Sequence, residues 1–184
     1  MANGSPEDVS SASGAMVIPV YVSQDCPHAD SVNPGYGITW QTTAGGATII
    51  KSLGITFYDT ELKSNLTEQS GQYFYPGIEQ VALMADTGSW QYLPEINCRH
   101  QGGVVLTYHD TSGTAWLSYR IDTSYTPRQA DSFFMITSSE IVDHSSGERC
   151  VKVEGAFACK LYSANGDSIS ISDGRFEAML NNPV

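Results

Sequence analysis

The chain has few basic residues: 9 Lys and Arg stand against 20 Asp and Glu among 184 residues, which gives a formal net charge of −11 at pH 7. Nucleic acids and anionic lipid surfaces both require a basic footprint, so this shortage argues against either class of partner. Any run approaching the roughly 18 apolar residues of a membrane span is also missing. With 41% hydrophobic and 10% aromatic residues, however, the chain is not a disordered polyelectrolyte, because disorder needs low hydrophobicity as well as high charge.

Recognisable catalytic motifs are absent as well. The sequence contains no Gly-x-Ser-x-Gly elbow, no Gly-rich phosphate loop, no His-Glu-x-x-His and no dinucleotide fingerprint. The pair His109-Asp110 has the residue types of a base with its orienting acid, but its place at a predicted hairpin tip favours turn chemistry. The sequence therefore predicts a protein that is not an enzyme.

The first residues lack the apolar and aromatic side chains that would fix them to a core. Such a segment does not bury enough surface to offset its ordering entropy, so we expect a flexible arm over residues 1–15 and a single domain over residues 16–184. The arm also lacks the basic and apolar regions of a signal peptide. The location therefore stays open between extracellular, cell-surface or particle-associated and cytoplasmic.

Strand patterns dominate the domain. Apolar residues alternate with period two between recurrent Gly and Pro, Asp110–Gly113, Asn165-Gly166 and Asp173-Gly174 have turn chemistry, and Gly155 indicates a bulge or bend. Strands are expected at 16–23, 38–42, 47–58, 72–75, 103–110, 114–122, 133–142, 149–162, 168–171 and 175–180, and at 78–85 a short helix competes with a strand. About ten strands at this spacing predict an all-β fold, an antiparallel β-sandwich with a jelly roll or barrel as the alternative.

The four cysteines leave several chemistries open. Cys26 and Cys98 each begin a Cys-x-His motif, and the two motifs together have the ligands of a Cys₂His₂ zinc site. A disulfide framework is the other interpretation, with Cys26–Cys98 or Cys98–Cys159 as pairings, and a fully reduced chain remains a third. Cys150 and Cys159 have opposite parity in one predicted strand, so we do not expect them to bridge. Cys159 falls on the apolar face and should be buried.

Acidic residues in turns are candidates for calcium. Asp110, Asp167 and Asp173 lie in predicted turns, where carboxylates and backbone carbonyls suit an oxygen-liking cation. No loop shows an EF-hand pattern, so the sequence predicts no cofactor, with calcium or zinc as the alternatives.

Aromatic residues near turns are candidates for glycan or protein contact. Trp90, Tyr92 and Trp116 form the first group. Of the three tryptophans in the chain, Trp40, Trp90 and Trp116, we expect two to be core residues. Trp116 alternates with polar residues and so is expected on the more polar face of its strand. Tyr73 and Tyr75 belong to a dense aromatic run that would suit a contact patch.

The strand that follows the arm suggests a mode of assembly. Its apolar residues Val17, Ile18, Val20 and Val22 could pair with the sheet edge of a neighbouring subunit by strand addition, and Pro19 is compatible with an edge strand. The alternative, which the sequence favours, is that this strand completes its own sheet. The predicted function is structural or binding, through protein–protein contacts with other proteins or with itself at a cell or particle surface; glycan binding is the alternative.

A family resemblance appears in the C-terminal half, where VVLTYHDTSG, DSFFMITSSEI and VKVEGAFACKLYSANGDSISISDGRF follow one another. Gly155-Ala156-Phe157, the Asn-Gly turn and the segment ISDGRF at 171–176 are similar to the last strands of uncharacterised β-sandwich domains in surface lipoproteins of Bacteroidota, with Ser172 where that pattern has Thr. The resemblance covers less than half of the chain. It implies a β-sandwich and a surface setting, and no functional residues.

Overall fold

The structure, a computed structural model, describes residues 18–20, 35–44, 48–58, 68–70, 73–75, 78–93, 102–120, 131–143 and 147–181. In these ranges the chain forms strands and one short helix. They are β1 (Ile18–Val20), β2 (Gly35–Ala44), β3 (Thr48–Tyr58), β4 (Glu68–Ser70), β5 (Tyr73–Tyr75), α1 (Ile78–Met84), β6 (Gly88–Trp90), β7 (Gly103–His109), β8 (Ala115–Leu117), β9 (Phe133–Asp143), β10 (Arg149–Ser163) and β11 (Ser168–Asn181). The all-β prediction is confirmed for the described part of the chain.

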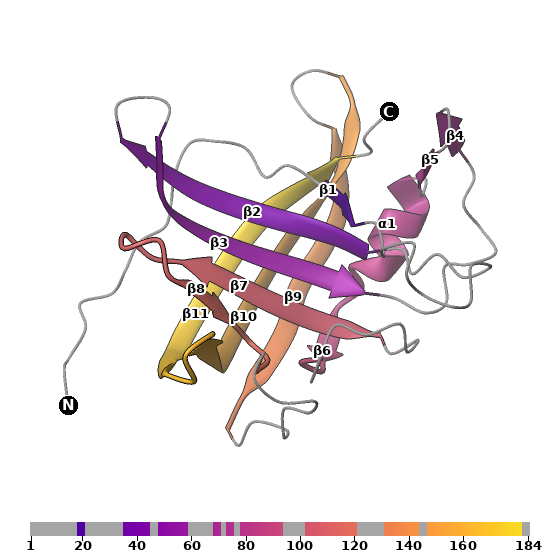
Figure 1. Cartoon of the computed structure of the whole chain (residues 1–184). Coiled ribbons are helices and arrows are strands. Elements are labelled where there is room, and N and C mark those ends of the chain that lie inside the picture. The colour runs from indigo at the N-terminus through magenta and orange to yellow at the C-terminus, as the bar shows by residue number, and fades with distance from the viewer. Residues whose placement is uncertain are drawn as a thin grey trace, which may run out of the picture.

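The strands form one curled antiparallel sheet. Its order is β1-β2-β3-β7-β8-β10-β9-β6, and β11 pairs with the other edge of β10, while β4 and β5 form a separate hairpin. The front layer in Figure 1 contains β2, β3 and β7, and the back layer, which crosses it, contains β9, β10 and β11. The short strand β8 joins the layers because it pairs with β7 on one side and with the end of β10 on the other. The fold is thus a half-barrel, and a sandwich of two separate sheets is not confirmed.

Aromatic rings fill the space between the two layers. Phe134 of β9 is 1% exposed and lies 5.4 Å from Phe57 of β3, measured between ring centroids. It also stacks on Phe157 at 6.1 Å and on Phe176 at 5.4 Å. Buried rings contribute large apolar areas and favourable edge-to-face and offset contacts, so this cluster holds the layers together.

Two glycines make close packing between β10 and β11 possible. Gly155 lies opposite Phe176 in the strand register, and Phe157 lies opposite Gly174. A Cβ at Gly174 would lie 2.5 Å from ring atoms of Phe157, so each ring occupies the space above the opposite glycine. The prediction of a turn at Asp173-Gly174 is therefore wrong: β11 continues through these residues, and Gly174 serves the packing of a ring instead.

Bulges occur in the pairing of β10 with both of its neighbours. The register with β9 shifts between Glu154 and Gly155, at the predicted position, but the extra residue is Thr137 of β9 rather than Gly155 of β10. The register with β11 shifts between Phe157 and Cys159, so that two residues of β11 oppose one residue of β10. Bulges increase local twist, which fits the curvature of the back layer.

The segment at 78–85 forms a helix rather than a strand. Val81 and Ala85 of this region are buried in the main core, while Leu83 points outward and is 73% exposed. The Nη1 atom of Arg149 lies 2.8 Å from Glu79 Oε1 and joins α1 to the start of β10. No helix in the described ranges has the length and apolar character needed to cross a membrane.

Two further predictions concern the lengths of the expected strands and the N-terminal arm. Strand pairing bears out most of the expected strands, but β8 ends at Leu117, so the strand expected over 114–122 is much shorter. The arm predicted at residues 1–15 lies outside the described residues.

Candidate functional site

The outer face of the back layer is the candidate interaction surface. Strand alternation sends successive side chains of β9 to opposite sides, so that Phe134 and Ile136 point to the core while Phe133 and Met135 point outward. The same alternation places Lys152 and Glu154 of β10 on the side opposite Val151 and Val153. We call the outward side chains of β9, β10 and β11 the outer face.

Exposed apolar side chains gather on β9. Phe133, Met135 and Ile141 are 46%, 38% and 38% exposed, and with Leu83 they make up the large exposed hydrophobic residues of the described chain. Ile141 lies opposite Val151, whose side chain points to the core, so Phe133 and Met135 are the two that share the outer face. Single exposed apolar residues are common on protein surfaces, but two that are adjacent on one face of a strand indicate a contact surface. The carbonyl oxygen of Phe133 accepts a hydrogen bond from the Tyr92 hydroxyl at 3.1 Å, which fixes the backbone at the start of the strand.

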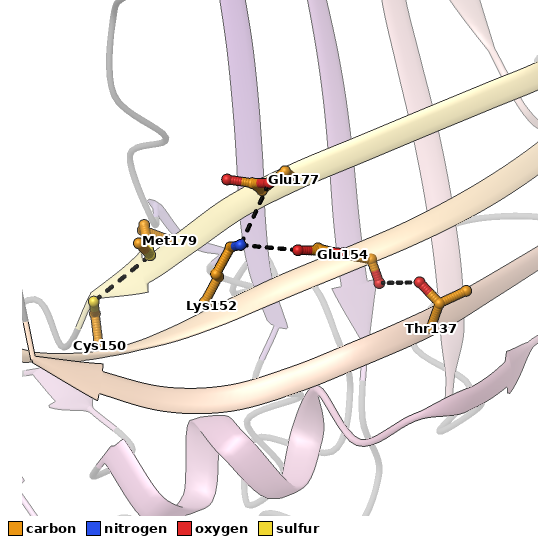
Figure 2. A network of polar contacts seen from close by, with 6 residues as sticks. All are labelled: Thr137, Cys150, Lys152, Glu154, Glu177 and Met179. Atoms are coloured by element: carbon orange, nitrogen blue, oxygen red, sulfur yellow. Dashed lines mark hydrogen bonds and ion pairs between the residues drawn. The ribbon is translucent and has the colours of Figure 1, made fainter.

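An ion network lies beside this apolar strand (Figure 2). Lys152 Nζ lies 2.8 Å from Glu154 Oε1 and 3.5 Å from Glu177 Oε2. The hydrogen bond to Glu154 is the main cause of the raised pKa of Lys152. The hydroxyl of Thr137 donates to the carbonyl oxygen of Glu154 at 3.2 Å. The network contains one cation and two carboxylates and so keeps a negative charge.

Cys150 closes one end of the outer face and is not available for chemistry. Its Sγ lies 3.8 Å from the Met179 sulfur and 3.7 Å from the Val142 carbonyl oxygen, and the residue is fully buried. Burial raises the pKa of the thiol, with Asp143 and Glu148 adding to the effect. A buried neutral thiol behaves as a small apolar side chain.

Cys159 is likewise a free, buried thiol, as expected from its place on the apolar face. Burial raises its pKa to about 12, and a hydrogen bond with Tyr92 partly offsets the rise. The pKa of Tyr92 is also raised, first by burial and then by the neighbouring Cys159. No disulfide joins the described cysteines, Cys150 and Cys159. Cys26 and Cys98, and with them both Cys-x-His motifs, lie outside the described residues.

Asp110 holds the tip of the β7–β8 hairpin together through its hydrogen bonds. Its carboxylate accepts hydrogen bonds from the Ser112 hydroxyl (2.6 Å), the Ser112 amide (2.9 Å), the Thr114 amide (3.0 Å) and the Trp116 indole (2.9 Å). These donors lower the pKa of Asp110 to about 2. His109 Nδ1 lies 3.2 Å from the Ser52 hydroxyl rather than at the carboxylate. The turn-chemistry interpretation fits this geometry, since no base–acid pair is formed.

The tryptophans pack inward. Trp40, Trp90 and Trp116 are all partly buried against the main core, and Trp90 lies 5.3 Å from Phe57 between ring centroids. The placement of Trp116 on a polar face was wrong. It lies opposite Tyr108 on the core side, and its indole N–H bonds to Asp110.

The remaining candidates are Tyr92, the two tyrosines of β5 and the apolar residues of the N-terminal strand. Tyr92 is half-buried and packs on Phe134, and Tyr73 and Tyr75 lie on β5, which pairs with β4. Ile18 and Val20 lie on β1, which pairs with β2 of the same chain, as the alternative of a strand completing its own sheet predicts. Val17 and Val22 lie outside the described residues.

The calcium candidates do not come together. Asp110 accepts its hydrogen bonds within the β7–β8 hairpin, and Asp167 lies in the β10–β11 turn. Asp173 accepts a hydrogen bond from the Ser172 hydroxyl at 3.3 Å. Among the described residues no group of three or more His, Cys, Asp or Glu could hold a metal ion.

Comparison of the chain with protein-family models, curated proteins and solved structures finds no match.

Proposed function

We propose that this chain is a non-enzymatic structural protein, a β-sandwich-like scaffold that acts at a cell or particle surface through protein–protein contacts, including contacts with copies of itself. The observation that carries the proposal is the pair of exposed apolar side chains that share the outer face of β9, Phe133 and Met135. Water contact with these side chains is unfavourable, and burial against another protein removes it.

Charge supports a protein partner. A surface with few Lys and Arg does not attract phosphate backbones, whereas apolar side chains rimmed by charged ones resemble the core and rim of a protein interface. Met135 lies opposite Ala156 of β10, and Ala156 lies opposite the exposed Arg175 of β11. The arrangement combines an apolar centre with a polar border.

Glycan binding is less well supported. A stacking platform needs the face of an aromatic ring in solvent, and Trp90, Tyr92 and Trp116 instead pack on the core. The polar atoms of Tyr92 and Trp116 are also already bonded within the chain. These rings therefore stabilise the core rather than offer a platform for a glycan.

Light scattering of the wild type and of a Phe133→Ser/Met135→Ser variant tests the proposal. The wild type should have a mass above the 19.9 kDa of one chain, and the variant should shift to a smaller species. A Glu140→Ser variant changes an exposed polar residue of the same strand and is the matched control. A wild type that stays at the mass of one chain at every concentration contradicts the proposal.

A further inference from the structure

One long strand edge has no partner in the described part of the chain. β11 pairs with β10 along its length, and no described strand pairs with its other edge. In Figure 1 β11 forms a border of the back layer. The amide and carbonyl groups along such an edge form a template on which another strand can add.

Only the C-terminal half of β11 offers a regular edge. Ser172 and Asp173 together oppose Ala158 of β10, and this bulge interrupts the strand. From Gly174 to Asn181 the pairing with β10 is continuous, and no proline occurs there. An added strand would therefore pair with this half.

The charges on this half are complementary to themselves. Arg175 and Glu177 are two residues apart, both are exposed, and both point to the outer face. Arg175 has no ion-pair partner among the described residues. Glu177 shares Lys152 with Glu154, and Lys152 lies closer to Glu154. A cation without an ion-pair partner among the described residues and an incompletely neutralised carboxylate thus lie two residues apart, on an edge that no described strand covers.

We propose that the C-terminal half of β11 pairs antiparallel with β11 of a second copy, across a twofold axis at Phe176, so that Arg175 of each copy faces Glu177 of the other. The inference rests on the proposed function, and it names both the partner and the edge that is used. A C2 interface brings the same patch of both copies together, as this self-complementary strand requires.

Charge selects this register among its neighbours. An axis at Arg175 would place two arginines directly opposite each other, and an axis at Glu177 would do the same with two glutamates. Like charges in directly opposed cross-strand positions are destabilising. An axis at Gly174 would carry the pairing into the bulge at Ser172 and Asp173. The axis at Phe176 keeps like charges apart, leaves residues 174–178 of both copies in regular pairing clear of the bulge, and forms two ion pairs.

Charge reversal tests the pairing because the two ion pairs are symmetric. Arg175→Glu would place glutamates at both positions, and Glu177→Arg would place arginines there. Each single variant should raise the dimer Kd by about tenfold or more, measured by sedimentation equilibrium. The double variant Arg175→Glu/Glu177→Arg re-forms both pairs with their signs exchanged and should restore dimerisation to near the wild-type level.

Lys160→Glu is the matched control, since it changes the net charge by the same amount as Arg175→Glu at an exposed position of β10. It should leave the dimer Kd within about threefold of the wild type, because exposed charges away from the interface interact weakly. Thermal unfolding of each variant verifies that the fold is intact.

The outcomes separate this inference from the proposed function. A wild type that is monomeric throughout contradicts both. A wild type that assembles but responds equally to Arg175→Glu and Lys160→Glu overturns the β11 pairing and leaves self-assembly through β9 standing. Failure of the double variant to recover dimerisation also overturns the register at Phe176.

Discussion

Two neighbouring phenylalanines on β9 separate the two faces of the back layer. Phe134 is 1% exposed and lies among the rings of Phe57, Phe157 and Phe176, whereas Phe133 is 46% exposed on the outer face. The side chains are identical and adjacent in sequence, so strand alternation alone decides their surroundings. The inner ring contributes to stability, and the outer ring remains available for contact.

The same contrast continues across β10 and β11. On the inner face, glycines and phenylalanines fit together with no space for a further methyl group. On the outer face, Lys152 and its two glutamates form an ion network in contact with solvent. Packing on the inner face is specific in shape, whereas the outer face tolerates substitution. An interaction surface can therefore change without loss of the fold.

The largest expected difference comes from truncating the two rings. Phe134→Ala removes a buried ring and leaves a cavity, so we expect a loss of about 4 kcal/mol in the free energy of unfolding. Phe133→Ala should cost about 1 kcal/mol or less, since nearly half of that residue is already exposed to solvent. Denaturant unfolding of both variants measures the difference. Equal losses would break the comparison between the faces.

Alternation made much of the fold predictable. The period-two patterns in β9 and β10 depend only on which side chains are apolar, because one face of each strand turns to the core. In β7, residues 104–106 are apolar and buried on both faces. The expected burial of Cys159 and the position of the register shift at Gly155 followed from the same local rules. These features need no knowledge of distant residues.

Features that depend on distant residues were missed. Asp173-Gly174 has the sequence of a turn, but the ring of Phe157 on the opposite strand uses Gly174 as a packing site. Trp116 has polar neighbours at alternate positions, yet it lies opposite Tyr108 on the core side and its indole N–H donates a hydrogen bond to Asp110. Tertiary contacts override local preference in both cases.

The candidate surface was also only partly predictable. Sequence patterns marked Trp90, Tyr92 and Trp116 because exposed aromatics often bind ligands, and the structure places all three against the core. Phe133 and Met135 of β9 were overlooked, although they alternate with Phe134 and Ile136 in a run that is apolar on both faces. Such a run signals a strand covered on both sides, and here the described chain covers only one.

A methyl group added to the inner face should have the next largest effect. In Gly155→Ala the new Cβ would lie 2.6 Å from the carbonyl oxygen of Met135 and against the ring of Phe176, so backbone and ring must both shift. We expect a loss of about 3 kcal/mol in the free energy of unfolding. Gly54→Ala is the matched control, because its Cβ would have ordinary contacts of 3.7 Å or more. A Gly155→Ala variant as stable as Gly54→Ala would show that the ring can move.

The hairpin tip sharpens the comparison, because there an exposed polar group has a structural role. The pKa of Asp110 is lowered from 3.8 to about 2, chiefly by the Ser112 and Trp116 donors. The stabilisation from this carboxylate is therefore present above pH 4 and is lost as the pH falls through 2. Asp110→Asn should lower Tm at neutral pH, because the amide of asparagine cannot replace both acceptor oxygens. The fall should be smaller than that caused by Gly155→Ala.

The pH dependence distinguishes this role from a general loss of packing. Thermal unfolding of the wild type and of Asp110→Asn should give Tm values that converge between pH 4 and pH 2, as the wild-type carboxylate becomes protonated. A difference that persists unchanged at pH 2 would mean that charge at Asp110 is not what stabilises the tip.

The smallest effect is expected in the ion network of the outer face. Lys152→Met keeps the length of the side chain and removes its charge, and exposed ion pairs contribute little because water and salt screen them. Glu154 and Glu177 can turn toward solvent once the lysine charge is gone, so Tm should stay within the experimental error of the wild type. A fall comparable to that of Gly155→Ala would mean that the outer face stabilises the fold as the inner face does. In that case residues such as Glu177 would be constrained by their own chain and poorly suited to contact a second copy.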